Sequence, residues 1–243
     1  MRLNTAGLII REQTVGESDR LVTVLTAEYG IIRSFVRNAN KIKSRLLSST
    51  QLLSYSRLSI YKGRDSYIID EAEPMEVFFS LRDSIEKISL AQYFCELCSF
   101  LAPEEDNAEE ILKLMLNSLY LLSNNKSTQT IIKSVFELRL MSLIGYMPSL
   151  VACDTCGEFE SDTMFFNIQT GKLYCSTCAT NGYETGIGVI TAMRHICYAE
   201  PKKIFNFSLP EDGEKVLSYI TETYLIQLTG RKYKTLDFYR GLI

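Results

Sequence analysis

Four cysteines in two pairs are the feature that most restricts what this chain can fold into. Cys153 and Cys156 form one C-x2-C pair and Cys175 and Cys178 form another, with 18 residues between the pairs. A tight turn at each pair can aim two sulfurs at one ion, and two such pairs complete a tetrahedral thiolate cage. The spacing predicts one structural zinc ion (Zn²⁺), because four thiolates leave no open position for catalysis. The alternative is four unrelated reduced cysteines.

The other three cysteines of the seven do not extend this cage. Cys95 and Cys98 share the C-x2-C spacing but lie inside a helical pattern, whereas a redox motif would stand at a helix N-terminus after a strand. We therefore expect them to be core residues. Cys197 and the single histidine, His195, fall on a later helix, where we expect structural roles for both.

The first 75 residues read as short strands. Segments rich in Ile, Val, Leu, Tyr and Thr alternate with turn sequences such as GESD, EYG and KGRD. Five short strands in about 70 residues suit a five-stranded OB-like barrel, and an SH3-like barrel is the competing interpretation.

From about Pro74 the hydrophobic spacing becomes helical, and it resumes after Gly188. We therefore predict an α+β protein in which an N-terminal OB-like DNA-binding β-barrel, residues 1–76, precedes an α-helical domain, residues 77–243. A zinc-binding insertion at 150–182 interrupts that helical domain.

A net charge of −3 hides an uneven distribution of charge. Residues 29–64 contain no acidic residue, whereas acids gather elsewhere in the sequence, as at 103–106 and 109–110. Positive charge follows a phosphate backbone, and interleaved aromatic residues such as Phe35 and Tyr61 can stack on bases. We predict that the eight basic residues of this stretch bind nucleic acid: Arg33, Arg37, Lys41, Lys43, Arg45, Arg57, Lys62 and Arg64. The alternative is a solvated charged face.

Enzyme signatures are missing from the sequence. It contains no Walker-type phosphate loop, dinucleotide-binding glycine motif, nucleophile elbow or H-E-x-x-H motif. Acidic residues such as Asp65 and Asp70 could in principle hold Mg²⁺, but we expect them to be solvated. No stretch has the length of a membrane span or of a signal-peptide core. We therefore expect a cytoplasmic protein that is not an enzyme and has no membrane partner.

Taken in order, these segments resemble the RecO family of bacterial DNA repair and recombination mediators. Residues 16–30, GESDRLVTVLTAEYG, are similar to the family's opening pattern, and Lys41 to Arg45 resembles its basic K-x-x-S-R loop. The most specific segment is FELRLMSLIGYMPSLVACDTCG at 136–157, and RKYKTLDF near the C-terminus resembles the closing pattern. The resemblance covers nearly the whole chain.

This resemblance implies a function that the residues alone do not give. RecO-like proteins bind single- and double-stranded DNA, work with RecR, help RecA to load, and anneal strands coated with single-strand-binding protein. Their helical body docks that protein's C-terminal tail. A nucleoid-associated protein would follow. Two other hypotheses remain: a zinc-ribbon nucleic-acid-binding protein of transcription or RNA metabolism, and a metal-dependent nuclease.

Overall fold

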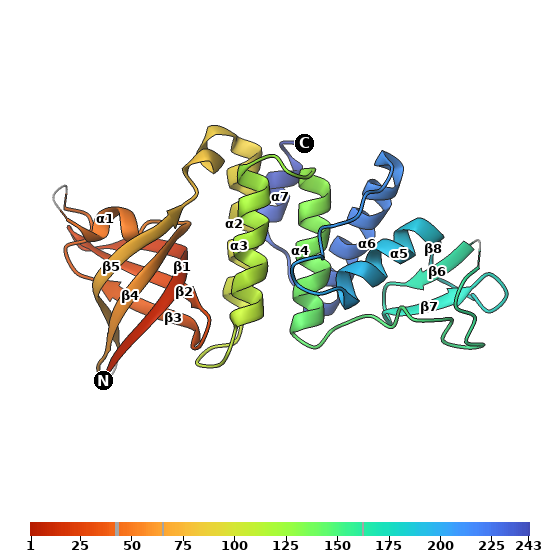
Figure 1. The fold of residues 1–243 in the computed structure, drawn as a ribbon, viewed down its shortest axis with the longest axis horizontal. Helices are drawn as coiled ribbons and strands as arrows, with labels where there is room; N and C mark the ends of the chain where they lie inside the picture. The colour runs from red at the N-terminus through yellow and green to blue at the C-terminus, as the bar shows by residue number, and fades with distance from the viewer. Residues whose placement is uncertain (42–43, 65, 162) are drawn as a thin grey trace. The chain divides into compact units, whose positions relative to one another are not determined.

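Five strands at the N-terminus close into a barrel (Figure 1). The computed structural model describes residues 1–41, 44–64, 66–161 and 163–243. The barrel strands are β1 (Arg2–Val15), β2 (Asp19–Thr26), β3 (Gly30–Val36), β4 (Ser54–Lys62) and β5 (Tyr67–Val77). Their order around the barrel is β1-β2-β3-β5-β4, and only the closing β3–β5 pair is parallel. This order, with the short helix α1 (Leu46–Ser49) between β3 and β4, confirms the OB-like barrel.

Alternation of side chains explains why these segments form a barrel. In β2 and β4 every second residue faces inward, as the period of two requires. The inward residues are mostly β-branched or aliphatic, which suits a pleated and half-buried surface. The core consists of Leu3, Ile9, Val22, Val24, Ile32, Val36, Ala39, Leu58, Ile60 and Ile69.

The chain divides into two compact units. Unit 1 contains Met1–Asn124 and Tyr233–Ile243, and unit 2 contains Asn125–Lys232. Besides the barrel, unit 1 holds a 3-10 helix, η1 (Phe79–Asp83), and the helices α2 (Ile85–Leu101), α3 (Glu109–Ser123) and α7 (Lys234–Arg240). Helix α7 packs on α2, where the carboxylate of Glu96 accepts hydrogen bonds from the backbone N–H and hydroxyl of Thr235.

The loop between α2 and α3 is fixed to the barrel by backbone contacts. The N–H of Ile31 donates to the carbonyl of Pro103 at 2.9 Å, and the N–H of Ala108 donates to the carbonyl of Ala27 at 2.8 Å. Gly30 has φ +57°, and a Cβ there would lie 2.1 Å from the Pro103 oxygen. Glycine is required at position 30 both for its backbone conformation and for this close approach.

The described residues of unit 2 form three helices and a small sheet. The helices are α4 (Gln129–Leu143), α5 (Ile187–Tyr198) and α6 (Glu211–Thr229), and the sheet strands are β6 (Thr163–Asn167), β7 (Lys172–Cys175) and β8 (Tyr183–Gly186). Strand β6 lies between its two antiparallel neighbours. Between α4 and α6, the buried ammonium of Lys133 pairs with the carboxylates of Glu137 at 2.9 Å and Glu222 at 2.8 Å.

None of the helices in the described parts of the chain is long and apolar enough to cross a membrane.

Replacing Gly30 with Ala should lower the free energy of unfolding by about 1–3 kcal/mol, because the new Cβ would collide with the Pro103 carbonyl. Gly16→Ala is a matched control, since Gly16 has nearly the same φ, +61°, but open space around it. Urea denaturation of both variants measures the difference. Equal losses of stability in the two variants would mean that the loop between α2 and α3 moves away from the new Cβ at no cost in free energy.

Candidate metal centre and nucleic-acid interface

The four cysteines of the two C-x2-C pairs come together in unit 2. Their sulfur atoms all lie within 4.8 Å of one another, and Cys156 Sγ and Cys175 Sγ are 3.6 Å apart. A tetrahedral cage with zinc–sulfur bonds of about 2.3 Å has sulfur–sulfur edges of about 3.8 Å, so the spacing fits one ion. Cys153 and Cys175 are buried, whereas Cys156 is exposed. These four side chains could hold a metal ion.

Backbone turns position the sulfurs. The N–H of Gly157 donates to the carbonyl of Cys153 at 3.0 Å, and Gly157 has φ +77°. At the second pair, the N–H groups of Cys178 and Ala179 donate to the carbonyl of Cys175 at 3.1 and 2.9 Å. The sheet carries this second pair, because Cys175 is the last residue of β7 and pairs with Met164 of β6.

Other contacts join the two cysteine pairs. The N–H of Asp154 donates to the carbonyl of Leu173 at 2.8 Å, and the carboxylate of Asp154 pairs with Lys172 at 2.9 Å. Below the cage, Leu150, Phe166 and Leu173 are fully buried. The apolar layer is small, so an ion would add the cross-link that the segment otherwise lacks.

The acidity of the thiols shows why a cation suits this cluster. Burial opposes ionisation of Cys153, but backbone N–H groups of Cys156, Cys175 and Thr155 lower its pKa to about 6. Hydrogen bonds with the sulfurs of Cys156 and Cys175 raise the pKa of Cys178 to about 12. The Cys178 thiol therefore does not ionise near neutral pH unless a nearby cation compensates the charge of its thiolate.

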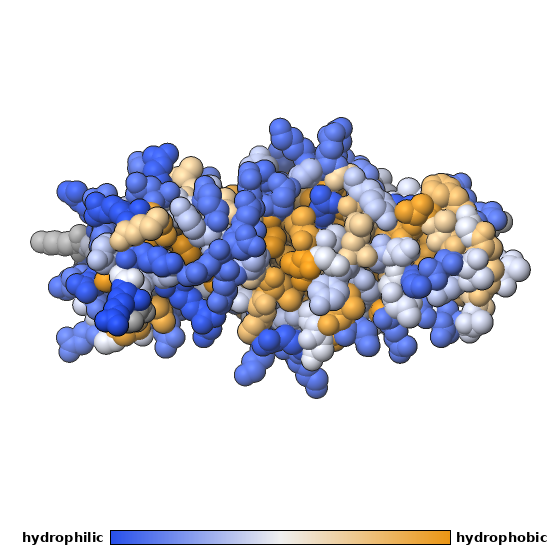
Figure 2. Space-filling view, turned by 90° about the horizontal axis from the view of Figure 1, so that it is seen from below, coloured by the Kyte–Doolittle hydropathy of each residue, from blue (hydrophilic) through white to orange (hydrophobic). Residues whose placement is uncertain are grey.

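The predicted nucleic-acid residues fall on the barrel of unit 1. All seven that lie within the described residues are exposed, and Lys43 lies outside them. The side of the barrel seen in Figure 2 is mostly hydrophilic. Among the described residues, no carboxylate is within ion-pair distance of Arg37, Lys41, Arg45 or Arg64.

Three of the seven described residues have acidic partners. Arg33 pairs with Glu104 at 3.0 Å, Lys62 with Glu105 at 3.4 Å and Arg57 with Glu73 at 3.3 Å. The surface around Arg57 is acidic, because its partner strand β5 also exposes Asp70, Glu71 and Glu76. A phosphate would be repelled there, so the environment of Arg57 is the least favourable of the three.

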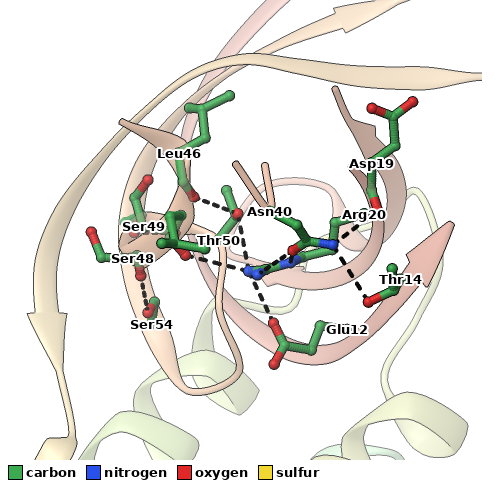
Figure 3. Close-up of polar contacts among 12 residues, drawn as sticks. Glu12, Thr14, Asp19, Arg20, Asn40, Leu46, Ser48, Ser49, Thr50 and Ser54 are labelled. Atoms are coloured by element: carbon green, nitrogen blue, oxygen red, sulfur yellow. Dashed lines mark hydrogen bonds and ion pairs between the residues drawn. The ribbon is translucent and has the colours of Figure 1, made fainter. Parts of the chain in front are cut away.

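The first part of the basic loop, residues 37–41, is held in place by a buried arginine (Figure 3). The side chain of Arg20 is only 9% exposed, and its guanidinium donates to the side-chain oxygen of Asn40 at 2.8 and 3.2 Å. It also donates to the carbonyl of Leu47 and the hydroxyl of Thr50, each at 3.4 Å, and pairs with the carboxylate of Glu12 at 3.0 Å. Arg20 thereby joins β1, the loop and α1.

Asp19 and Asn40 complete the attachment of this loop. The carboxylate of Asp19 accepts from the N–H of Asn38 at 2.8 Å, and Asn38 adopts the left-handed φ of +54°. The side-chain amide of Asn40 donates to the carbonyl of Asp19 at 3.2 Å. With Asn38 and Asn40 held in this way, Arg37, Lys41 and Arg45 are exposed to solvent.

Two further residues beside the barrel were not predicted as site residues. Arg11 of β1 and Phe100 of α2 line a cavity of about 290 Å³ together with Arg33. Phe100 is 48% exposed, and Phe35 and Tyr61 are the most exposed aromatics of the basic stretch, at 39% and 47%. The acid-free window, residues 29–64, begins after Arg11 and ends before Phe100, so it could not include either residue.

The cage can be tested by metal analysis. Wild-type protein should carry about one divalent ion per chain, and Cys156→Ser should lose it, because three thiolates and a hydroxyl hold a soft ion poorly. The melting temperature should fall as well. Cys197→Ser is the control, since Cys197 does not belong to the four-cysteine cluster. Unchanged metal content and melting temperature in Cys156→Ser would contradict a structural role for the ion.

The role of Arg20 can be tested by its removal. Arg20→Ala should lower the free energy of unfolding by about 3 kcal/mol, because it leaves several buried groups without a partner. Limited trypsin digestion should then cut the loop 37–45 faster. In the control Arg2→Ala, loss of the exposed pair with Asp70 should cost less than about 1 kcal/mol. An unchanged digestion rate in Arg20→Ala would show that the loop is held by other contacts.

Comparison with known proteins places the chain in a family. Residues 1–78 match the family described as "Recombination protein O N terminal", and residues 82–237 match "Recombination protein O C terminal". The chain is 31% identical to the DNA repair protein RecO of Acetivibrio thermocellus over 99% of its own length and 97% of the relative's. It is 30% identical to the protein of that name from Caldicellulosiruptor bescii over 98% of each chain. With both halves matched and relatives aligned end to end, this chain belongs to the RecO family.

Proposed function

We propose that this chain is a recombination mediator in DNA repair that binds DNA and has no catalytic activity of its own. Its family and its relatives, which are named DNA repair proteins, support a role in DNA repair and recombination. The observation that carries the proposal is that the OB-like barrel exposes Arg37, Lys41 and Arg45 without acidic partners among the described residues, with the backbone at 38–40 held by Arg20 and Asp19. OB-like barrels commonly bind nucleic acid on such a surface.

The loop is the primary DNA contact in this proposal. Arg37, Lys41 and Arg45 are exposed, and Arg20 and Asp19 hold the backbone between Arg37 and Lys41, so less conformational entropy is lost when phosphates bind there. Lys43 belongs to the same loop but lies outside the described residues. Arg64, on the β4–β5 turn, supplies a separate positive charge. Contact with both single- and double-stranded DNA follows, because phosphates carry most of the binding and are common to both.

The partners of the mediator are part of the proposal. We assign to this chain the family's cooperation with RecR, its indirect assistance to RecA, and its contact with the C-terminal tail of the single-strand-binding protein. Annealing of complementary strands coated by that protein is the activity expected from these contacts. A DNA-binding surface confined to the barrel would leave the helices free for protein contacts.

The metal in the four-cysteine cage is zinc in this proposal, with a structural role. Thiolate ligands in a tetrahedral set favour zinc, and four protein ligands exclude a reacting water. Zinc binding by small peptides of this kind contributes about 10–16 kcal/mol, enough to fix a segment with a thin apolar layer.

Annealing tests the function. Two complementary oligonucleotides, each coated with the cognate single-strand-binding protein, are mixed without ATP, and duplex formation is followed by fluorescence. This protein should accelerate annealing, and Arg37→Glu/Lys41→Glu/Arg45→Glu should abolish the acceleration. Loss of three phosphate contacts should also lower the slope of log affinity against log salt by about 2 for single strands.

The control for charge is Lys202→Glu/Lys203→Glu/Lys215→Glu, which changes net charge equally on exposed residues of unit 2. It should bind an uncoated oligonucleotide like the wild type. No acceleration by folded, metal-containing wild-type protein would refute the mediator function, and a preference for RNA would favour the transcription or RNA alternative.

A further inference from the structure

The loop between α2 and α3 places two carboxylates on cations of the barrel. We call residues 103–106, with the sequence PEED, the acidic loop. Glu104 pairs with Arg33 at 3.0 Å and Glu105 with Lys62 at 3.4 Å. Glu105 also accepts a hydrogen bond from the hydroxyl of Tyr67 at 2.9 Å. Both cations belong to the basic stretch, so the loop covers part of the surface that the sequence predicts for nucleic acid.

The backbone holds the acidic loop against the barrel. Glu104 forms β-bridges with Gly30 and Ile31, next to the hydrogen bond between Ile31 and Pro103. Glu105 has φ +56°, a conformation that few residues other than glycine adopt. The two carboxylates therefore occupy defined positions.

In the second ion pair, Lys62 and Glu105 each favour the charged form of the other. Hydrogen bonds from Tyr67 and Lys62 lower the pKa of Glu105, and hydrogen bonds with Tyr67 and Glu105 raise the pKa of Lys62. Both groups are thus charged at neutral pH. All four side chains are exposed to solvent, between 44% and 68%, so each ion pair is weak and can be exchanged for another anion.

Arg33, which pairs with the acidic loop, lies in line with Arg37, which has no acidic partner among the described residues. Arg33 and Phe35 lie on the outer face of β3, two residues apart, and Arg37 follows the strand in the same phase. A nucleic-acid strand that binds Arg37 and stacks a base on Phe35 would meet Arg33 next. A carboxylate and a phosphate use the same partners at an arginine or a lysine.

We propose that Glu104 and Glu105 occupy the positions of two phosphates, so that the acidic loop is an intramolecular competitor for the Arg33 and Lys62 part of the DNA surface. The inference rests on the proposed function, because it requires that the barrel binds DNA. Binding of a strand displaces the two carboxylates, which then repel it. The loop thereby lowers the affinity for DNA. It also makes the dependence of that affinity on salt shallower than the number of cations on the surface would suggest.

The test compares two pairs of neutralised acids. Glu104→Gln/Glu105→Gln should raise the affinity for a fluorescein-labelled oligo-dT by about three- to tenfold, measured by anisotropy at several salt concentrations. Glu109→Gln/Glu110→Gln removes the same charge from α3, where the partner is Lys113 and not the barrel, and should change affinity less than about twofold. Thermal melts verify that both variants are folded.

A second background separates competition from a general charge effect. In Arg33→Gln/Lys62→Gln, the additional change Glu104→Gln/Glu105→Gln should no longer raise affinity. Equal gains from the two acid pairs, or a gain that persists without Arg33 and Lys62, would overturn the inference while leaving the proposed function intact. Absence of oligo-dT binding by the wild type would instead refute the proposed function, and the inference would fall with it.

Discussion

The buried guanidinium of Arg20 is the interaction on which the barrel's binding surface depends. Removing a charge from water is expensive unless every donor finds a partner. Arg20 meets this demand with a carboxylate, an amide oxygen, a carbonyl and a hydroxyl, which come from β1, the loop 37–45 and α1. Without these contacts, the positive charges of the loop would repel one another and the loop would adopt many conformations. Burial of one cation thus fixes the backbone between the exposed residues Arg37 and Lys41.

Local patterns in the sequence predicted much of the fold and of the metal centre. The five strands, the α+β class and the clustering of Cys153, Cys156, Cys175 and Cys178 are confirmed. Elements too short to show a period were missed: the helices α1 and α7 and the sheet strands β6–β8.

The exposed positive charge of the barrel was harder to predict from the sequence, because ion pairs join segments that are far apart in the chain. The partners Arg33 and Glu104 are 71 residues apart in the chain, and Lys62 and Glu105 are 43 apart. A window without acids therefore indicated more free positive charge than the barrel surface has. No local pattern reveals that Pro103 returns to Gly30, although the glycine that permits this approach stands in the family-like segment 16–30.

The division of the chain into units also has a kinetic meaning. Unit 2 is continuous in sequence, whereas unit 1 is completed only by Tyr233–Ile243, whose helix α7 packs on α2. During synthesis, domains generally fold as they emerge from the ribosome. Residues 125–232 can therefore reach their structure while the surface of α2 that later meets Tyr233 and Leu236 is still bare. Until the last eleven residues of unit 1 arrive, that apolar surface is a place where a nascent chain can be recognised by chaperones or associate with another.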